Sequence, residues 1–284
     1  MKRLLLCLAL LATPASAQTL SDAEARAQIK PISAKKIILV GDSTTAVQGG
    51  WGPSFCADHV TSFLACINLA RGGRSTFNYR AEGSWDIALH EMKSGGFAAT
   101  YVLIQFGHND QPGKPGRSTD LVAEFPANLR AYVSEVRAAG AIPVLVTPLT
   151  RRGFESGRLQ DDLGPWADAI RKVAAEMDVP LVDLYARSQT VVQALGAAQA
   201  TQFAQVPPPA DVAAAAQTGT TIPATPLPPA ATPAQVNAIL EPMGAAKLSF
   251  DYTHLGRSGA DFFAGIVTEE LSKAVPELRR ELIP

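Results

Sequence analysis

The sequence predicts an α/β fold in which a parallel sheet carries helices on both faces. Five short, continuously apolar runs are typical of strands that are buried on both sides, namely residues 36–40, 65–70, 101–106, 142–147 and 180–184. Apolar residues at helical spacing separate or follow these runs, as in 129–136, 166–177 and 260–271. Repeated strand–helix alternation implies five parallel strands with right-handed crossovers, arranged as a three-layer α/β/α sandwich.

Composition excludes several classes of protein. The 284 residues include 25 Lys and Arg against 26 Asp and Glu, so the formal net charge of −1 provides no global field for binding nucleic acid. The longest apolar run is too short to span a bilayer. Three cysteines are too few for a disulfide scaffold or a cysteine-rich zinc module. No metal-ligand spacing occurs elsewhere, so we expect neither a metal nor another cofactor.

The first residues are typical of a secretory signal peptide. Lys2 and Arg3 precede an apolar stretch, and Ala15-Ser16-Ala17 forms a cleavage site of small residues. We therefore expect residues 1–17 to be removed, residues 18–284 to form one domain, and the product to be secreted or periplasmic. A buried N-terminal helix is the alternative.

Export would place Cys56 and Cys66, the two cysteines that follow residue 17, in an oxidising compartment. Cys56 lies on a predicted helix, and Cys66 enters the next predicted strand. A helix packed beside that strand could bring the two thiols within bonding range. The sequence leaves open whether they form a disulfide or remain two buried thiols.

One segment interrupts the strand–helix pattern. Residues 204–232 are dominated by Ala, Pro, Thr and Gln and contain the prolines of 207–209 and 228–229. Such a composition buries little apolar area. We expect an extended surface insertion within the single domain.

The residues needed for acyl transfer lie in the loops that follow the predicted strands and just before the last predicted helix. Ligands of parallel α/β sheets bind at the carboxyl ends of the strands. Ser43 follows the first strand and supplies a nucleophilic hydroxyl, which requires a neighbouring base. His254 is the candidate base, because histidine changes its protonation near neutral pH. Asp251 stands three residues earlier and can hold the other imidazole nitrogen. The backbone N–H groups of Ser43 and Gly73 and the side-chain amide of Asn109 are the candidate donors to an oxyanion.

Together, the blocks GDSTT, GGRS, FGHND and DYTH resemble those of the SGNH (GDSL-type) hydrolases. The longer runs YVLIQFGHNDQ, VTPLTRRGF and AEMDVPLVDL resemble the rhamnogalacturonan acetylesterases of carbohydrate esterase family 12. The resemblance implies a flavodoxin-like sandwich that removes acetyl groups from acetylated pectin. It also implies Ser43, Gly73 and Asn109 around the oxyanion, with Asp251 and His254 completing the triad.

Arginines crowd the loops after the second and fourth strands, which favours an anionic substrate such as a uronic-acid polymer. Arg74 and Arg152 are the preferred substrate contacts, among a set that also includes Arg71, Arg80, Arg151 and Arg158. The expected partner is thus an acetylated polysaccharide or oligosaccharide, with no nucleic acid and no membrane. The alternatives are a broader carbohydrate esterase, a lipase-like esterase, or an inactive polysaccharide-binding module.

Overall fold

The computed structural model describes residues 20–223 and 248–284, which belong to two units, Met1–Ser33 and Ala34–Pro284. In the first unit, α1 (Asp22–Ala27) begins with a capping box between Ser21 and Glu24. The predicted signal peptide lies outside the described residues. None of the helices in the described ranges is long and apolar enough to cross a membrane.

The second unit is built on a five-stranded sheet in the order β2-β1-β3-β4-β7, with every neighbouring pair parallel. Its strands are β1 (Lys35–Gly41), β2 (Leu64–Asn68), β3 (Thr100–Gln105), β4 (Ile142–Val146) and β7 (Leu181–Val182). All five lie within or beside the predicted apolar runs. The order is that of flavodoxin-like folds, which confirms the predicted fold class.

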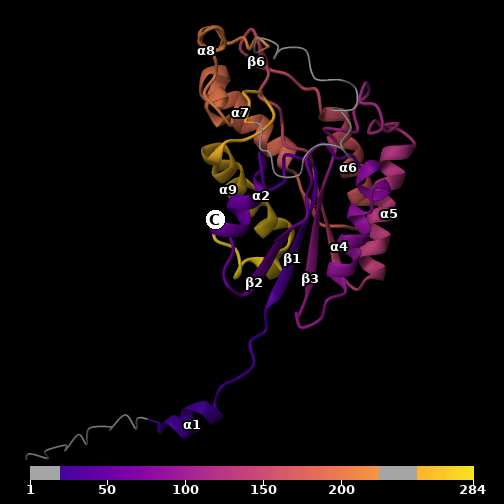
Figure 1. Ribbon diagram of the computed structural model, residues 1–284, viewed down its shortest axis with the longest axis vertical. Coiled ribbons are helices and arrows are strands. Elements are labelled where there is room, and N and C mark those ends of the chain that lie inside the picture. Colours follow the sequence, from indigo (N-terminus) through magenta and orange to yellow (C-terminus); the bar gives the residue numbers. More distant parts are fainter. Residues whose placement is uncertain (1–19, 224–247) are drawn as a thin grey trace, which may run out of the picture. The chain divides into compact units, whose positions relative to one another are not determined.

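Helices cover both faces of this sheet (Figure 1). One face packs on α2 (Gly52–Asp58), α7 (Leu184–Ala200) and α9 (Arg257–Ala274). The other packs on α4 (Ser84–Met92), α5 (Glu124–Ala138) and α6 (Gly164–Glu176). Short helices complete the unit: α3 (Asn78–Ala81), α8 (Ala210–Gln217), η1 (Thr201–Phe203) and η3 (Pro276–Leu278).

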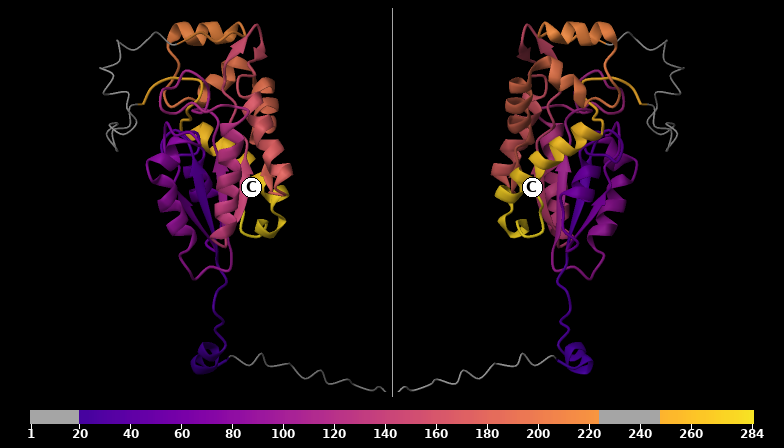
Figure 2. Two further views of the ribbon diagram at one scale, coloured as in Figure 1. Left: turned by 90° about the vertical axis from the view of Figure 1, so that its right-hand side faces the viewer. Right: turned by 90° about the vertical axis from the view of Figure 1, so that its left-hand side faces the viewer.

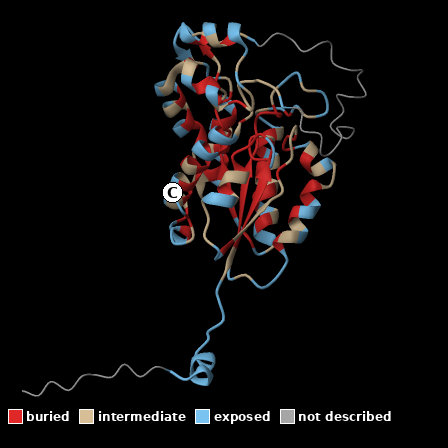
Figure 3. Ribbon diagram, turned by 60° about the vertical axis from the view of Figure 1, so that its left-hand side comes forward, coloured by how far each residue is buried: buried red, intermediate tan, exposed pale blue. Residues whose placement is uncertain are grey.

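The strands of the sheet are buried, as Figure 3 shows. Successive side chains of β1 point alternately into the two apolar cores on either side of the sheet. Ile37 and Leu39 belong to the core under α2, α7 and α9, whereas Ile38 and Val40 belong to the core under α4, α5 and α6. All four side chains are fully buried. This is why the strand reads as a continuous apolar run and not as an alternating one.

The structure corrects the prediction for residues 204–232 in part. Residues 210–217 form α8, and Val212 and Ala216 are buried. An alanine run is the strongest helix former and needs little apolar area to dock, which the composition argument overlooked. Residues 224–232 lie outside the described part of the chain.

A small antiparallel ribbon, which the sequence analysis missed, follows β4. It consists of β5 (Phe154–Glu155) and β6 (Arg158–Leu159), joined by Ser156 and Gly157, whose φ angles are both positive, 50° and 80°. The ribbon lies beside the segment after α8 (Figure 2), because Thr221 N–H donates to the Phe154 carbonyl.

The structure also joins Cys56 of α2 to Cys66 of β2 as a disulfide, with the two Cα atoms 5.3 Å apart. The bond fixes α2 against the edge strand of the sheet. Because α2 follows directly on the loop of Ser43, this link also ties down the far end of that loop.

Candidate active site

The candidate site lies where the strand order reverses, between β1 and β3. From β1 the chain continues to β2 on one side, and β3 pairs with β1 on the other. The loops leaving these strands therefore diverge and leave a crevice at the carboxyl edge of the sheet. Ser43 follows β1, Gly73 follows β2 and Asn109 follows β3.

Asp42 shapes the turn that presents Ser43. One Asp42 carboxylate oxygen accepts hydrogen bonds from the Thr44 N–H and the Thr44 hydroxyl, both at 2.8 Å. Asp42 and Thr44 are fully buried, whereas Ser43 is partly exposed. The turn is thus held from within while the serine side chain remains accessible.

Gln105, at the end of β3, is a functional residue that sequence reasoning missed. Its Oε1 accepts hydrogen bonds from the indole N–H of Trp51, at 3.0 Å, and from the hydroxyl of Thr45. Its Nε2 donates to the Thr147 carbonyl at 3.2 Å. The available signal was a polar residue closing an otherwise apolar strand, because a buried amide requires partners.

The three candidate oxyanion donors lie on loops that touch one another. A β-carbon placed on Gly72 would lie 3.6 Å from Ser43 Cβ, so the second loop runs directly beside the serine. Asn109 Nδ2 donates one hydrogen bond to the Arg74 carbonyl at 3.0 Å, which leaves its second amide proton available. The N–H groups of Ser43 and Gly73 have no acceptor among the described residues. These adjoining loops therefore carry three hydrogen-bond donors that are available to an oxyanion.

Buried Asp110 binds two of the neighbouring segments together. One of its oxygens accepts hydrogen bonds from Thr76 N–H at 3.0 Å, from the Thr76 hydroxyl at 2.6 Å and from the Thr119 hydroxyl at 3.0 Å. Burial outweighs these donors and raises the pKa of Asp110 to about 7. The carboxyl fixes the position of adjacent Asn109.

Asp251 and His254 form the predicted pair. Asp251 Oδ2 lies 2.7 Å from His254 Nδ1, and Asp251 Oδ1 accepts hydrogen bonds from the N–H groups of Thr253 and His254, each at 2.7 Å. Burial alone would raise the pKa of Asp251, but the hydrogen bonds and the charge of His254 prevail and lower it to about 2. The carboxylate orients the imidazole and is ionised throughout the neutral range.

Gly49 brings the two ends of the site together. Leu255 N–H donates to the Gly49 carbonyl at 2.8 Å, which joins the loop of Ser43 to the loop of His254. A β-carbon on Gly49 would lie 3.2 Å from His254 Cδ2. The histidine ring therefore packs on the serine loop. In the described residues no hydrogen bond joins the Ser43 hydroxyl to His254, a bond that often tightens only when substrate binds.

Arg152 is not an exposed substrate contact, and the structure corrects that prediction. Its side chain is fully buried and donates to the carbonyls of Asp251 at 3.2 Å, Thr253 at 3.2 Å and His254 at 2.8 Å. Burial lowers the pKa of Arg152 to about 10, although the nearby Asp251 charge opposes this shift. Arg152 holds the Asp251–His254 loop from beneath.

Arg74, the other predicted substrate contact, is also mostly buried. Its Nε and Nη2 contact the Glu82 carboxylate at 2.8–3.0 Å, and its Nη1 donates to the Gly72 carbonyl at 2.6 Å. The guanidinium group braces the Gly72–Gly73 turn. Its carboxylate partner occupies the face that a substrate would need.

His108 lies on the loop after β3, beside the turn of Ser43. It is buried with Nδ1 3.4 Å from the Asp42 carboxylate, and burial lowers the pKa of His108. No cluster of three His, Cys, Asp or Glu side chains that could hold a metal occurs within residues 20–223 and 248–284.

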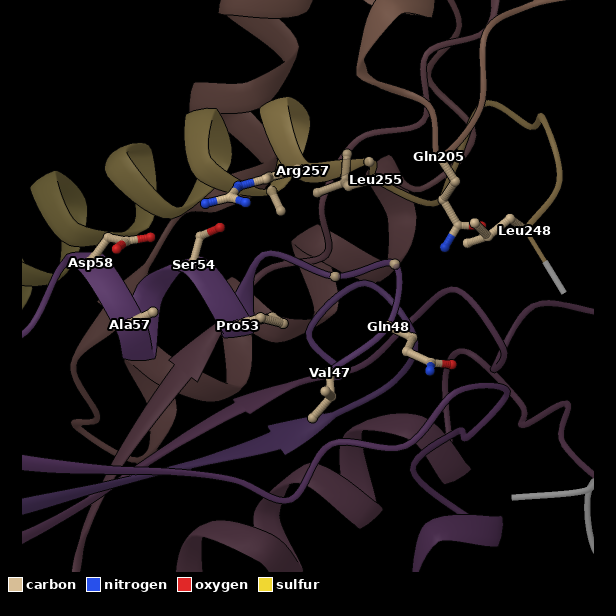
Figure 4. Close-up of a pocket in the computed structure, with 14 residues that line it drawn as sticks. Val47, Gln48, Pro53, Ser54, Ala57, Asp58, Gln205, Leu248, Leu255 and Arg257 are labelled. Atoms are coloured by element: carbon tan, nitrogen blue, oxygen red, sulfur yellow. The ribbon is translucent and has the colours of Figure 1, made fainter. Parts of the chain in front are cut away.

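A pocket of about 520 Å³ opens beside the Gly49–Leu255 contact (Figure 4). Val47, Pro53, Leu248 and Leu255 provide apolar walls, and other lining groups are polar: Gln48, Ser54, Asp58, Gln205 and Arg257. Gly49 and Leu255 also lie next to His254, but neither His254 nor Ser43 lines the pocket.

We predict that Gly49→Ala displaces His254. The added methyl group requires the ring to move by a few tenths of an ångström, so kcat/KM on p-nitrophenyl acetate should fall about tenfold. Gly96→Ala is the matched control, because Gly96 also has a positive φ, 92° against 85° at Gly49, but has no neighbour within 4 Å. Both variants should lose about 1–2 kcal/mol of unfolding free energy. Equal activity in the two would contradict this role for Gly49.

We also predict an acid-dependent contribution of Asp251 to stability. Because its folded-state pKa of about 2 lies below the ordinary 3.8, ionised Asp251 stabilises the fold above about pH 4 and loses this effect as the pH falls toward 2. With its side chain 35% exposed, the effect should be screened to about 1 kcal/mol. Urea unfolding of wild type and Asp251→Asn between pH 5 and 2.5 measures it. A difference that stays constant over this range would disprove the assignment.

The sequence is similar to those of known proteins. Residues 39–207 match the GDSL-like lipase/acylhydrolase family. Rhamnogalacturonan acetylesterase RhgT of Bacillus subtilis is 37% identical over 175 residues, which are 59% of this chain and 71% of that protein. The probable rhamnogalacturonan acetylesterase YesY of the same organism is 34% identical over 162 residues, 55% of this chain and 72% of that protein.

Solved structures show the same fold. Protein YxiM of Bacillus subtilis superposes with a TM-score of 0.60 at 22% identity, covering 86% of this chain but only 58% of that one. A catalytic mutant of Axe2, an acetylxylan esterase from Geobacillus stearothermophilus, gives a TM-score of 0.51 at 17% identity, covering 86% of this chain and 96% of that one. The family match extends over more than half of the sequence. This chain therefore belongs to the GDSL-like lipase/acylhydrolase family and is a carboxylic ester hydrolase.

Proposed function

We propose that this chain is a serine esterase that removes acetyl groups from an acidic plant polysaccharide, namely rhamnogalacturonan or a related pectin. The observation that carries the proposal is the packing of the Asp251–His254 pair on the loop of Ser43 through Gly49. This packing brings a nucleophile, a base and an orienting carboxylate to one edge of the sheet. The proposed domain is residues 18–284, after removal of residues 1–17.

In this mechanism the Ser43 oxygen attacks the acetyl carbonyl while His254 Nε2 accepts the hydroxyl proton. The sugar oxygen then leaves with that proton, and Ser43 keeps the acetyl group. A water molecule, deprotonated by His254, attacks the acetyl-serine; the bond to the Ser43 oxygen breaks, His254 returns the proton to that oxygen, and acetate is released. Asp251, bound to Nδ1, stabilises the imidazolium formed in each half-reaction.

The unused N–H groups of Ser43 and Gly73 and the second amide proton of Asn109 are the proposed oxyanion donors. Negative charge develops on the carbonyl oxygen only in the transition state, so fixed donors there lower the barrier selectively. Each such donor contributes about 3–4 kcal/mol in well-studied esterases and proteases. Gln105, Asp110 and Arg74 support the proposal because they hold the three loops in place.

The proposed substrate is inferred from the names of relatives with similar sequences. RhgT, YesY and a protein of Emericella nidulans that is 28% identical over 191 residues are all named as established or probable rhamnogalacturonan acetylesterases. The pocket lined by Gly49 and Leu255 would give a polymeric substrate room for groups at a distance from the acetyl moiety.

One observation favours a second candidate, a lipase-like esterase. The pocket of Figure 4 has apolar walls from Val47, Pro53 and Leu255, which would suit an acyl chain longer than acetyl. Its polar lining, which includes Gln48, Gln205 and Arg257, matches sugar hydroxyl groups better. We therefore retain the acetylesterase as the first candidate.

We further propose a secreted or periplasmic location. The basic, apolar and small-residue segments of 1–17 support export. The Cys56–Cys66 disulfide is consistent with it, since such bonds persist mainly in oxidising compartments.

Ser43→Ala should lower acetate release at least a thousandfold while leaving the fold intact, because the acyl-enzyme cannot form. Circular dichroism and acetate assays measure the two effects. Ser272→Ala, at a partly exposed position of α9, is the control and should retain wild-type rates. Residual activity of Ser43→Ala within tenfold of wild type would refute the nucleophile.

A substrate panel separates the two candidate functions. We expect acetate release from acetylated rhamnogalacturonan to exceed that from acetylated xylan, and p-nitrophenyl acetate to be cleaved faster than p-nitrophenyl octanoate. The expected preference is at least tenfold in kcat/KM for each pair. Faster cleavage of the octanoate would instead establish the lipase-like function.

A further inference from the structure

Most cations around the candidate site are already neutralised or buried. Arg80 contacts Glu135 at 2.7 Å, and Arg151 contacts Asp162. Arg74 is engaged by Glu82, and Arg152 lies beneath the triad loop. These side chains cannot bind a substrate carboxylate without releasing a protein partner.

Arg117, which the sequence analysis did not single out, differs from them. It is partly exposed, and no carboxylate of the described residues lies within ion-pair distance of it. Its Nη1 donates one long hydrogen bond, 3.5 Å, to the Gly73 carbonyl. A guanidinium group has five N–H donors, so most of them remain available.

The two glycines of the second loop place Arg117 beside the reacting serine. The β-carbon position of Gly72 lies 3.6 Å from Ser43 Cβ, and that of Gly73 lies 3.2 Å from Arg117 Nη1. Ser43 and Arg117 thus contact successive residues of one turn. A substrate held at the Gly73 N–H would extend past the guanidinium group.

Arg117 projects from a loop that is held in one conformation. Its N–H donates to the Lys114 carbonyl at 3.0 Å, and Thr119 binds Asp110 through both its N–H and its hydroxyl. The Ser118 hydroxyl donates to the Gln111 carbonyl at 2.8 Å. The backbone that carries Arg117 therefore needs no further ordering when the side chain binds a ligand.

The surroundings of Arg117 are electropositive. Lys114 Nζ donates to the His108 carbonyl, and Arg151 Nη2 donates to Gln111 Oε1 at 2.7 Å, so three cations surround one short loop. Burial, together with the charges of Arg151 and Arg117, lowers the pKa of Lys114. Asp162 offsets one of the three charges, which leaves an excess of positive charge at this rim.

We propose that Arg117 forms an anion subsite at the rim of the oxyanion loop and binds the carboxylate of a uronic acid residue close to the acetylated sugar. The inference rests on the proposed function and assigns the recognition of acidic substrate to one side chain. The planar fork of arginine accepts a carboxylate in two parallel hydrogen bonds. Arg117 acts in substrate selection, and the oxyanion remains with Ser43, Gly73 and Asn109.

Arg71 and Arg257 are the competing cations, because neither has an ion pair within the described residues. Arg71 lines a different pocket, together with Tyr79 and Ile87. Arg257 lines the pocket of Figure 4, where Asp58 would repel a second carboxylate. Arg117 is favoured over both because its guanidinium group contacts Gly73.

The test compares Arg117→Gln, Arg117→Lys, Arg257→Gln and Arg158→Gln with wild type on acetylated galacturonan and acetylated xylan. Arg117→Gln should raise KM on the galacturonan at least tenfold with kcat changed less than threefold. The kcat/KM ratio of galacturonan to xylan should fall by the same factor. Arg117→Lys should retain part of the preference, and Arg158→Gln, exposed on β6, should retain all of it. Equal losses on both polymers, or a loss of preference only in Arg257→Gln, would overturn the proposal.

A binding assay separates this proposal from the proposed function. Oligogalacturonate without acetyl groups should inhibit p-nitrophenyl acetate hydrolysis by wild type, with an inhibition constant at least tenfold higher in Arg117→Gln. A carboxyl-reduced oligomer should inhibit both proteins equally. Wild type that binds oligogalacturonate through Arg117 but releases no acetate from any pectin would refute the function alone. Equal inhibition of wild type and Arg117→Gln by oligogalacturonate would refute the subsite.

Discussion

The geometry of the candidate site depends on one backbone hydrogen bond, from Leu255 N–H to the Gly49 carbonyl. Ser43 reaches the site because β1 ends there, whereas His254 reaches it because α9 packs against α2 in the same apolar core. The hydrogen bond joins these two independently positioned segments. A side chain at Gly49 would crowd the imidazole, because a β-carbon there would lie 3.2 Å from His254 Cδ2. Packing of one face of the sheet thus determines where the base meets the serine.

The buried guanidinium group of Arg152 holds the Asp251–His254 loop in position but lowers the stability of the fold. Removing a guanidinium group from water is unfavourable by several kcal/mol unless hydrogen bonds compensate, and the partners of Arg152 are three carbonyls instead of a carboxylate. Those carbonyls belong to Asp251, Thr253 and His254. Charge-assisted hydrogen bonds are short-range and directional, so they restrain a loop more tightly than apolar packing would. The fold therefore accepts a buried cation where the position of an imidazole matters.

The sequence predicted the parts of the molecule that depend on local pattern. Apolar runs identified all five strands of the sheet, and strand-end chemistry placed Ser43 and Asn109 at one edge. It could not predict the roles of Arg74 and Arg152, because a cation is free or engaged according to which group folding places beside it. Glu82 neutralises Arg74, and the carbonyls that engage Arg152 lie about a hundred residues away. The same limit hid Gln105 and Arg117, whose partners come from other loops.

The distribution of charge bears on how an acidic polymer would be recognised. The chain has a net charge of −1, so long-range attraction cannot gather a polyanion at the site. Attraction at physiological ionic strength decays over about 8 Å, which restricts recognition to direct contact. Pairing of Arg74, Arg80 and Arg151 with carboxylates removes competing cations from the surrounding loops. A uronic-acid polymer repeats its carboxylates along its length, so the Arg117 guanidinium beside Gly73 can hold it in several registers. Each of these registers would present a different sugar to Ser43.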